Sequence, residues 1–324
     1  MNIRPSNRAP LRGRRGRSSR IASALSAAAV VALTGTVSAC TSDVGKASSE
    51  PYPNVTVNPK LRELLPDEVR RDGTLTIVTD PNYPPLEFID GGRRGPTTDP
   101  IGADIDLGRA IAAKFGLRPT YEVTAFSNVV PAVAIQQFEL GISALWADNP
   151  QASMVNMVTY YQAGTQTATK KPADGTTPLA NGFCGQSVAV EEGTEYIDNL
   201  VKMSNNCTKA GKAPIDIRPA LSQDRASSLL EDGKTDAMVG DSPTVQYTVA
   251  NSGGKLVAVG PAVDVRPYGI AVSPRYSQLT GATQQAVQEL IDSGIYNQIL
   301  TRWQIDQGAV AKAGVLYRAQ AHTG

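Results

Sequence analysis

Alternating apolar and polar positions mark the first strand of the folded chain and lead into a turn rich in proline. Residues 75–79 read Leu-Thr-Ile-Val-Thr, in which apolar and β-branched side chains alternate as they do in a buried strand. Residues 80–85 contain three prolines and carry Tyr83, so a rigid turn follows the carboxyl end of this strand. Open α/β sheets bind ligands beside the carboxyl ends of their strands, which makes Tyr83 a candidate ligand contact.

Strand and helix patterns keep alternating along the rest of the chain. Residues 105–115 place apolar side chains at helical spacing, and Gly116 follows as a helix stop. The other expected elements are strands at 119–123, 140–146, 187–190, 214–218, 236–241, 255–259 and 267–272, and helices at 128–137 (capped by Ser127), 195–205, 222–230, 243–250, 278–293 and 295–303. Because strands joined by crossover helices lie parallel, the pattern predicts an α/β fold with largely parallel sheets.

The first 39 residues have the pattern of a secretory signal. Seven arginines precede an apolar segment at 21–37, and Cys40 follows Val37-Ser38-Ala39. The apolar segment is too short and too rich in alanine for a permanent membrane span. Residues 37–40 resemble the bacterial lipobox, which predicts signal-peptide cleavage before Cys40 and lipid attachment to it. Ordinary cleavage, with Cys40 incidental, is the alternative.

Removal of the signal changes the charge of the mature chain. The whole chain has 31 basic and 30 acidic residues, and loss of the seven signal arginines leaves 24 basic residues. The formal net charge therefore changes from +1 to about −6. Nucleic-acid binding needs a basic surface, so we expect no nucleic-acid partner.

Cysteine and histidine content restricts the chemistry further. Cys184 and Cys207 form an even pair in an exported chain, where oxidation is permitted, so we predict a disulfide between them; two free buried thiols are the alternative. The one histidine, His322, is the third residue from the end. Histidine-based nucleophilic dyads, general bases and zinc sites are therefore not expected, and the chain has no Gly-x-x-x-x-Gly-Lys phosphate loop. We expect no metal and no cofactor.

Several pieces of the sequence, in a specific order and spacing, together resemble a known family. The early pieces are Gly73-Thr74-Leu75, the turn at 80–88, Gly102-Ala103-Asp104-Ile105-Asp106-Leu107 and Ala110-Ile111, and the later ones are Gly193-Thr194, 233–241, Tyr268-Gly269 and Trp303. They are similar to the polar-amino-acid family (family 3) of bacterial solute-binding proteins, over about residues 61–313. The resemblance implies an extracytoplasmic receptor of an ABC importer that binds an amino acid or a similar small polar solute.

The resemblance also implies a two-lobed periplasmic-binding-protein-like fold (type II), with a two-segment hinge that lets the lobes close around the ligand. We expect lobe 1 at 60–163 plus 268–313 and lobe 2 at 164–267. A flexible tether at 40–59 would join the lipid anchor to lobe 1, and 314–324 would form a C-terminal tail. The expected partners are the ABC permease with its ATPase, at the outer face of the cytoplasmic membrane, to which the lipid anchor attaches the protein.

Asp241 is the residue that the resemblance assigns to the ammonium group of the ligand. It matches the aspartate that ends an Asp-Ala-x-x-x-Asp strand, here residues 236–241. A helix N-cap is the alternative role, because Ser242-Pro243 follows. The carboxylate partner of the family is an arginine in a Thr-Pro-Glu-Arg-like turn, and here Gln151 or Ala152 stands in its place. Neither side chain forms a bidentate ion pair with a carboxylate.

Three ways of compensating for the missing arginine are open. Arg225 or Arg266 could reach the carboxylate from the second lobe, although arginines at such positions are more often solvated surface residues. Backbone N–H groups and the hydroxyl at Gly193-Thr194, before a helix, could hold the carboxylate instead. The ligand could also lack a carboxylate.

Aromatic side chains near the predicted site support the possibility of a ligand without a carboxylate. Tyr83 is in the position where the family stacks its ligand, Phe126 follows a strand, and Trp146 replaces a small hydroxyl residue of the family. With Thr194 and Asp241 they complete the predicted ligand-binding set. Such a set suits an amine or a betaine-like cation, with roughly 0.5 to 2 kcal/mol from each good cation–π contact. Packing of Phe126 and Trp146 in the core is the alternative.

Two further classes of function stay open beside transport. A sensor receptor that signals to a membrane partner would have the same sequence features. Glu87 and Asp104 could perform acid–base chemistry, since dehydratases of the cyclohexadienyl type share this fold class, although carboxylates at such positions more often cap helices or pair with lysines. We therefore expect a binding protein and no enzyme.

Overall fold

The computed structural model describes residues 51–89, 99–172, 179 and 182–318. The predicted signal peptide, Cys40, the first part of the tether and the last six residues of the tail lie outside these ranges.

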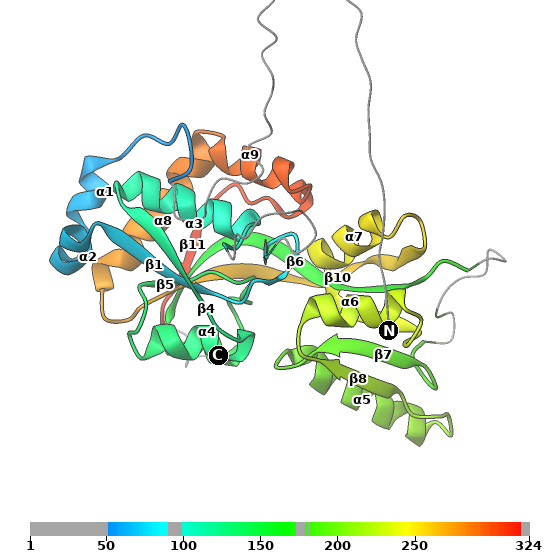
Figure 1. Ribbon diagram of the computed structural model, residues 1–324. Coiled ribbons are helices and arrows are strands. Elements are labelled where there is room, and N and C mark those ends of the chain that lie inside the picture. The colour runs from blue at the N-terminus through cyan, green and yellow to red at the C-terminus, as the bar shows by residue number, and fades with distance from the viewer. Residues whose placement is uncertain (1–50, 90–98, 173–178, 180–181, 319–324) are drawn as a thin grey trace, which may run out of the picture. The chain divides into compact units, whose positions relative to one another are not determined.

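One mixed sheet of nine strands connects both halves of the described chain (Figure 1). Its order is β4-β1-β5-β10-β6-β9-β7-β8, and β11 pairs with β6. The strands are β1 (Thr74–Thr79), β4 (Arg118–Val123), β5 (Leu140–Gly141), β6 (Asn156–Lys170), β7 (Ser187–Glu191), β8 (Asp216–Ala220), β9 (Ala237–Asp241), β10 (Leu256–Val272) and β11 (Gly314–Leu316), beside a separate two-stranded sheet of β2 (Asn82–Tyr83) and β3 (Glu87–Phe88). β1 lies parallel to β4 and β5, and β7 lies parallel to β8 and β9, which confirms the predicted α/β class.

Two long strands, β6 and β10, carry the sheet from one half to the other. They pair antiparallel from Asn156 opposite Val272 to Lys170 opposite Leu256, and the register shifts in the middle. The sequence pattern indicated two short strands where the structure has the single strand β10. The interruption is Gly260, whose φ of 69° turns the backbone locally before pairing resumes. The predicted lobe boundaries fall on or near these two strands and stay a prediction.

Helices cover both faces of the sheet. Figure 1 shows α3 and α8 on one face of the part that contains β1 and β5, and α4 on the other face. The helices of the described chain are α1 (Pro59–Glu63), α2 (Asp67–Asp72), α3 (Ala103–Phe115), α4 (Phe126–Ala134), α5 (Glu195–Lys209), α6 (Gln223–Glu231), α7 (Ser242–Asn251), α8 (Ser277–Asp292) and α9 (Ile295–Arg302), with the short 3-10 helices η1 (Pro150–Met154) and η2 (Asp306–Gly308).

Alternate side chains of β1 enter hydrophobic clusters on opposite faces of the sheet. Leu75 and Ile77 are fully buried in the cluster that contains residues of α3, α8 and α9. Val78 is fully buried in the cluster that contains residues of α4. This two-sided packing fixes the carboxyl end of β1, from which Asp80 and the turn with Tyr83 continue.

The second half of the sheet is packed in the same alternating way. Val188 and Val190 of β7 share a cluster with residues of α5, while Ala189 of β7 shares a cluster with residues of α6 and α7. β7 and β9 are adjacent parallel strands. Their last residues, Glu191 and Asp241, are therefore brought to the same edge of the sheet.

The predicted disulfide is present in the structure. Cys184 and Cys207 are joined with an S–S distance of 2.00 Å and a Cα–Cα distance of 5.5 Å. The bond ties the last turns of α5 to the segment that leads into β7.

Helix α4 begins earlier than the sequence pattern indicated. Its first residue is Phe126, and its N-cap residue Ala125 offers no side-chain hydrogen bond, so Ser127 lies inside the helix. The carboxylate of Asp80 accepts a hydrogen bond from the Phe126 N–H at 3.0 Å. A carboxylate from another segment therefore satisfies the start of this helix, which a local capping pattern does not reveal.

Residues near both described ends of the chain form regular structure or pack against the core, and the bounds of the predicted tether and tail stay a prediction. Asn58 caps α1 by accepting hydrogen bonds from the backbone of Lys60 and Leu61, and Tyr52 packs against the core of the first half. Residues 314–316 form β11 and pair with β6.

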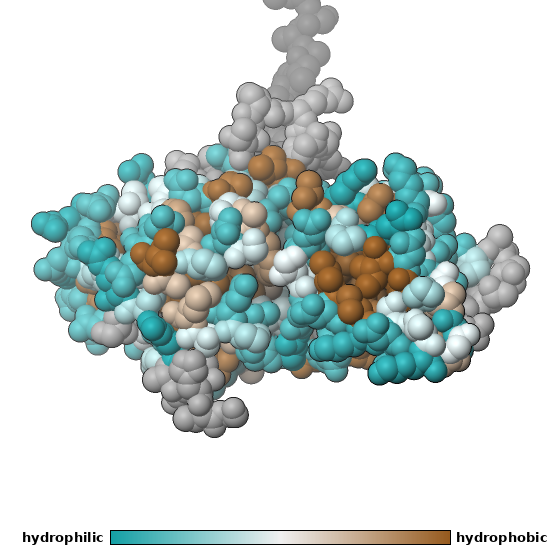
Figure 2. Space-filling view, turned by 90° about the horizontal axis from the view of Figure 1, so that it is seen from below, coloured by the Kyte–Doolittle hydropathy of each residue, from teal (hydrophilic) through white to brown (hydrophobic). Residues whose placement is uncertain are grey.

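Polar side chains cover most of the face shown in Figure 2, and hydrophobic ones gather there in separate patches. Within the described ranges, no helix combines the length and the apolar character needed to cross a membrane.

Candidate functional site

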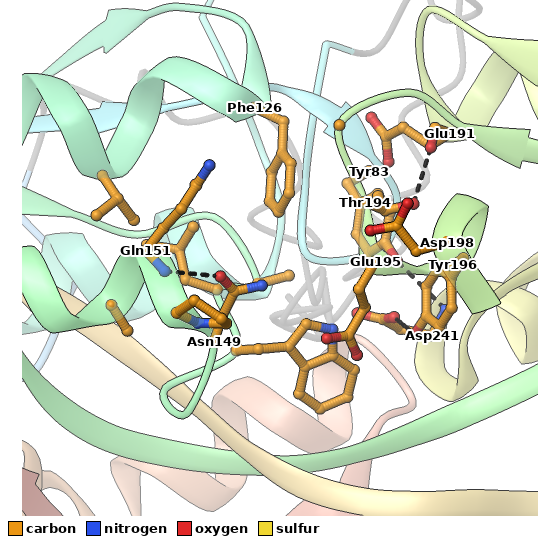
Figure 3. Close-up of a pocket in the computed structure, with 17 residues that line it drawn as sticks. Tyr83, Phe126, Asn149, Gln151, Glu191, Thr194, Glu195, Tyr196, Asp198 and Asp241 are labelled. Atoms are coloured by element: carbon orange, nitrogen blue, oxygen red, sulfur yellow. Dashed lines mark hydrogen bonds between the residues drawn. The ribbon is translucent and has the colours of Figure 1, made fainter. Parts of the chain in front are cut away.

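A cavity of about 300 Å³ is lined by residues from both halves of the sheet (Figure 3). All five predicted ligand-binding residues line it, namely Tyr83, Phe126, Trp146, Thr194 and Asp241. The remaining lining residues are Val130, Ala144, Leu145, Asn149, Pro150, Gln151, Ala152, Glu191, Gly193, Glu195, Tyr196 and Asp198. The structure thus brings the predicted set together, and its role in binding stays a prediction.

Asp241 ends β9 and is 3 % exposed. It occupies the N-cap position of α7, but its side chain makes no capping hydrogen bond. Its carboxylate instead accepts hydrogen bonds from the hydroxyls of Tyr196 and Tyr268. The Asp241 N–H donates to the Tyr83 hydroxyl at 3.3 Å. The alternative role as a helix cap is therefore not the one that this side chain performs.

Burial and the tyrosine hydrogen bonds shift the pKa of Asp241 in opposite directions. Burial raises the pKa of Asp241 from 3.8 to about 6, and the hydrogen bonds from Tyr196, Tyr268 and Tyr83 oppose that shift. A cation bound beside this buried carboxylate would stabilise its ionised form, because a nearby positive charge offsets the free-energy cost of burying the negative one.

Glu191 is a second buried acid at the cavity, and it was not among the predicted ligand-binding residues. It ends β7 and is 3 % exposed. Its pKa is raised from 4.5 to about 8, chiefly by burial and also by the charges of Asp80 and Asp241. The signal that could have found it is its place at the carboxyl end of a predicted strand, as for Asp241.

The amino end of α5 forms one wall of the cavity. Thr194 is the N-cap residue, and its hydroxyl donates to the Glu191 carbonyl oxygen at 2.8 Å. Gly193 has φ of 79°, a conformation that suits glycine at this tight turn. Glu195 and Asp198 stand in the first turn of the helix and also line the cavity. Two carboxylates at this helix end oppose an anionic ligand group there.

Aromatic side chains form the other walls. Trp146 is 6 % exposed, and its ring centroid lies 4.8 Å from that of Tyr268. Tyr83 is buried and Phe126 is half-buried against the cluster that contains residues of α4. In Figure 3, the Phe126 ring and the Glu191 carboxylate lie toward one end of the cavity.

Gln151 and Ala152, which stand where the resembled family has arginine, both line the cavity. They belong to η1, and the Gln151 N–H donates to the Asn149 side chain at 2.9 Å. Among the described residues that line the cavity, none is Lys, Arg or His, whereas four are Glu or Asp. The described lining therefore offers acidic groups and no basic ones, and these acidic groups are ionised most readily when a cation is present.

The two arginines considered as replacements differ in their placement. Arg225 is exposed and does not line the cavity. Arg266 forms an ion pair with Glu195 and another with Asp148 at 3.2 Å. Its guanidinium carbon lies 4.5 Å from the Trp146 ring centroid, so it covers one face of that ring. One of the two candidates is thus at the edge of the site.

Glu87 and Asp104 form a buried pair outside the cavity lining. Ser143 donates to Glu87 at 2.9 Å, while the Ala144 N–H and the Tyr160 hydroxyl donate to Asp104 at 2.9 and 2.7 Å. Burial and the Asp104 charge raise the pKa of Glu87 well above its ordinary value. The pair neither caps a helix by these contacts nor meets a lysine; it holds the backbone of Ala144, a cavity residue.

Metal ligation has no support among the described residues, since no group of three or more His, Cys, Asp or Glu side chains there is placed to hold an ion. The chemistry left to the cavity is that of buried carboxylates, tyrosine hydroxyls and aromatic faces. Carboxylates and aromatic faces are groups that interact favourably with organic cations.

Comparisons with known proteins show the family of the chain and its fold. Residues 75–306 match the family described as bacterial extracellular solute-binding proteins, family 3. The chain is similar to the arginine-binding protein ArgT of Corynebacterium glutamicum, with 29% identity over 88% of this chain and 92% of that protein.

Solved structures of similar fold include two ancestral proteins. One is an ancestral arginine-binding protein bound to arginine, with a TM-score of 0.61 and 27% identity over 71% of this chain and 98% of that one. The other is an ancestral amino-acid-binding protein described as a precursor of cyclohexadienyl dehydratase, with a TM-score of 0.59 and 25% identity over 73% of this chain and 98% of that one. The predicted two-lobed fold is confirmed by these likenesses.

Proposed function

The chain belongs to the bacterial extracellular solute-binding proteins, family 3, and from this premise we propose that its cavity binds a cationic amino acid of the arginine type. The observation that carries the proposal is the acidic lining of the cavity, which has four acidic residues and no basic one among those described. The name of the similar Corynebacterium glutamicum protein points to the same ligand.

The proposed ligand spans the cavity between its two buried acids. Asp241 receives the α-ammonium group, because its carboxylate is buried and already oriented by Tyr196 and Tyr268. Glu191 receives the side-chain cation beside the ring of Phe126. Tyr83 and Trp146 bound the space between them, and Thr194 holds the turn that carries Glu191.

An organic cation without a carboxylate, such as an amine or betaine, is the second candidate. The absence of a basic side chain from the described lining favours it, since an isolated carboxylate in this cavity would face like charges. The two candidates differ only in the carboxylate.

The proposed role is capture for transport and not catalysis. Binding across two lobes joined by β6 and β10 stabilises a closed form, which an ABC permease with its ATPase recognises. Glu87 and Asp104, the carboxylates considered for acid–base work, do not line the cavity. The name of the similar ArgT protein is that of a binding protein.

The test is a thermal-shift screen of the mature chain with cationic, neutral and acidic amino acids, agmatine and betaine. A ligand at about a hundred times its dissociation constant stabilises the folded state by about 2.7 kcal/mol. We expect a shift with arginine or a similar cation that is lost in Asp241→Asn. A shift confined to neutral or acidic amino acids would contradict the proposal.

The lipid anchor at Cys40 is a further part of the proposed function. It would hold the receptor at the outer face of the cytoplasmic membrane, within reach of the permease. The lipobox-like residues 37–40 support it. We expect Cys40→Ala to move the protein from the membrane fraction to the soluble extracytoplasmic fraction, and an unchanged membrane fraction would contradict the anchor.

A further inference from the structure

Arg266 lies at the edge of the cavity, and the ligand contacts proposed above leave it unused. It projects from β10 and contacts two residues of the cavity wall, because its guanidinium covers one face of Trp146 and pairs with Glu195. A second ion pair, at 3.2 Å, joins it to Asp148. The guanidinium thus contacts two lining residues without lining the cavity itself.

An amino-acid ligand brings a carboxylate that needs a partner in this cavity. The lining residues that the structure describes supply acids but no Lys, Arg or His, and Glu195 and Asp198 occupy the helix end that would otherwise attract an anion. A guanidinium matches a carboxylate with two parallel N–H···O hydrogen bonds. Arg266 is placed to make that contact.

The present partners of Arg266 are placed to exchange with such a ligand. The side chains of Arg266 and Glu195 are each 26 % exposed, and that of Asp148 is 42 % exposed. Ion pairs with this much contact with water contribute little to stability. A ligand carboxylate that is shielded from water by the closed site would therefore compete well for the guanidinium.

We propose that Arg266 is a specificity-determining residue that receives the α-carboxylate of the ligand. On binding, the ligand carboxylate replaces that of Glu195, while Asp148 and the Trp146 ring keep the guanidinium in place. A ligand without a carboxylate leaves the pair between Arg266 and Glu195 intact. Arg266 thus distinguishes an amino acid from the corresponding amine, and the inference rests on the proposed cationic amino-acid ligand.

Arginine and agmatine test the inference, because agmatine is arginine without its carboxylate. Isothermal titration calorimetry measures both ligands on the wild type, Arg266→Gln and Arg266→Lys, and the melting temperatures of the ligand-free proteins report whether each variant folds. Arg275→Gln is the matched control. Arg275 also lies over an aromatic ring, that of Tyr276 at 5.1 Å, and pairs with Glu68 at 3.1 Å, and none of these three residues lines the cavity.

The expected result is a loss that depends on the carboxylate. Arg266→Gln weakens arginine binding roughly ten- to a hundredfold and changes agmatine binding less than about threefold. Arg266→Lys keeps the charge without the planar fork, so it loses less arginine affinity than Arg266→Gln, and the Arg275→Gln control changes neither ligand.

Four outcomes would overturn the inference, and they have different meanings. An equal loss of affinity for both ligands in Arg266→Gln would mean that Arg266 has only a structural role, through its ion pairs with Asp148 and Glu195. An unchanged arginine affinity would place the carboxylate elsewhere. Wild-type binding of agmatine without arginine would leave the cationic site standing but remove the carboxylate contact. Wild-type binding of neither ligand would overturn the proposed function itself.

Discussion

Replacement of Glu191 by glutamine is the perturbation that most directly separates a buried cation site from an ordinary polar pocket. Glu191 is 3 % exposed, and its pKa is raised to about 8, first by burial and then by the charges of Asp80 and Asp241. At neutral pH and without ligand, the side chain is therefore mostly protonated. Glutamine has nearly the same shape as the protonated acid, so Glu191→Gln should leave the ligand-free fold almost unchanged.

The pKa of Glu191 determines how binding of a cation depends on pH. A cation favours the ionised form, so ligand binding releases the proton and the affinity rises with pH up to about the pKa of the empty site. With a pKa of about 8, the ionised fraction of Glu191 rises from about one in a hundred at pH 6 to about one half at pH 8, which contributes a roughly fiftyfold gain in affinity. Asp241, with a pKa of about 6, contributes a further gain of about twofold, so the wild-type affinity should rise roughly a hundredfold over this range. About one proton per ligand should be released at pH 7.

Titration calorimetry measures both quantities. Affinities for arginine at about pH 6, 7 and 8 give the slope, and two buffers of different ionisation enthalpy give the number of protons released. Glu191→Gln should reduce the change in affinity over this range to about twofold, the part that remains from Asp241 with its pKa of about 6. Glu192→Gln, at the exposed neighbouring residue, is the matched control and should behave as the wild type.

Two results would refute this reasoning. The first is a wild-type affinity that does not change between pH 6 and pH 8. The second is a slope that survives in Glu191→Gln, since the titrating group would then be another residue.

Three further predictions follow from other buried groups. Asp241→Asn should abolish the ligand-induced thermal shift and raise the melting temperature of the ligand-free protein. The reason is that the pKa of Asp241 is raised from 3.8 to about 6, so keeping the buried carboxylate ionised at neutral pH costs up to about 3 kcal/mol. A lower melting temperature would mean that the tyrosine hydrogen bonds to Asp241 outweigh this cost. Glu87→Gln should become more stable relative to the wild type as pH rises above about 5. Burial and the Asp104 charge raise the pKa of Glu87 in the folded state, so the wild type loses stability as pH rises past the unfolded-state pKa of 4.5. Urea midpoints of both proteins, measured across this range, would contradict the prediction if their difference stayed constant. Replacing Cys184 and Cys207 by alanine should lower the free energy of unfolding by roughly 3 kcal/mol, since the disulfide spans 23 residues. An unchanged urea midpoint would show that the bond does not constrain the unfolded chain.

Strand ends were the part of the site that the sequence could reveal. Tyr83 follows β1 and was expected at the cavity because ligands bind beside the carboxyl ends of parallel strands. Asp241 ends β9 and was expected there because the family resemblance assigns it to the ligand. Glu191 has the same position on β7 but was not singled out. Its burial depends on the packing of β7 between neighbours that are distant in the sequence.

Contacts between distant segments were beyond the reach of local patterns. Arg266 meets Glu195 across 71 positions of sequence and Asp148 across 118, and the irregular middle of β10 sets where its side chain projects. The start of α4 was misjudged for the same reason, since the Asp80 carboxylate that satisfies Phe126 comes from a turn 46 residues earlier. Helices and strands could be predicted from the periodicity of apolar residues. The ion pairs and hydrogen bonds between distant side chains could be identified only from the three-dimensional structure.

The most direct test of the central claim compares arginine with citrulline by titration calorimetry on the wild-type mature chain at about pH 8. The two amino acids have nearly the same shape, but citrulline has a neutral ureido group in place of the guanidinium. A cavity with buried Glu191 and Asp241 predicts that arginine binds and that citrulline binds at least roughly a hundredfold more weakly, because its neutral ureido group cannot form the buried ion pair that the guanidinium makes with Glu191. Equal affinities for the two, or tighter binding of citrulline, would contradict a site built for a cation.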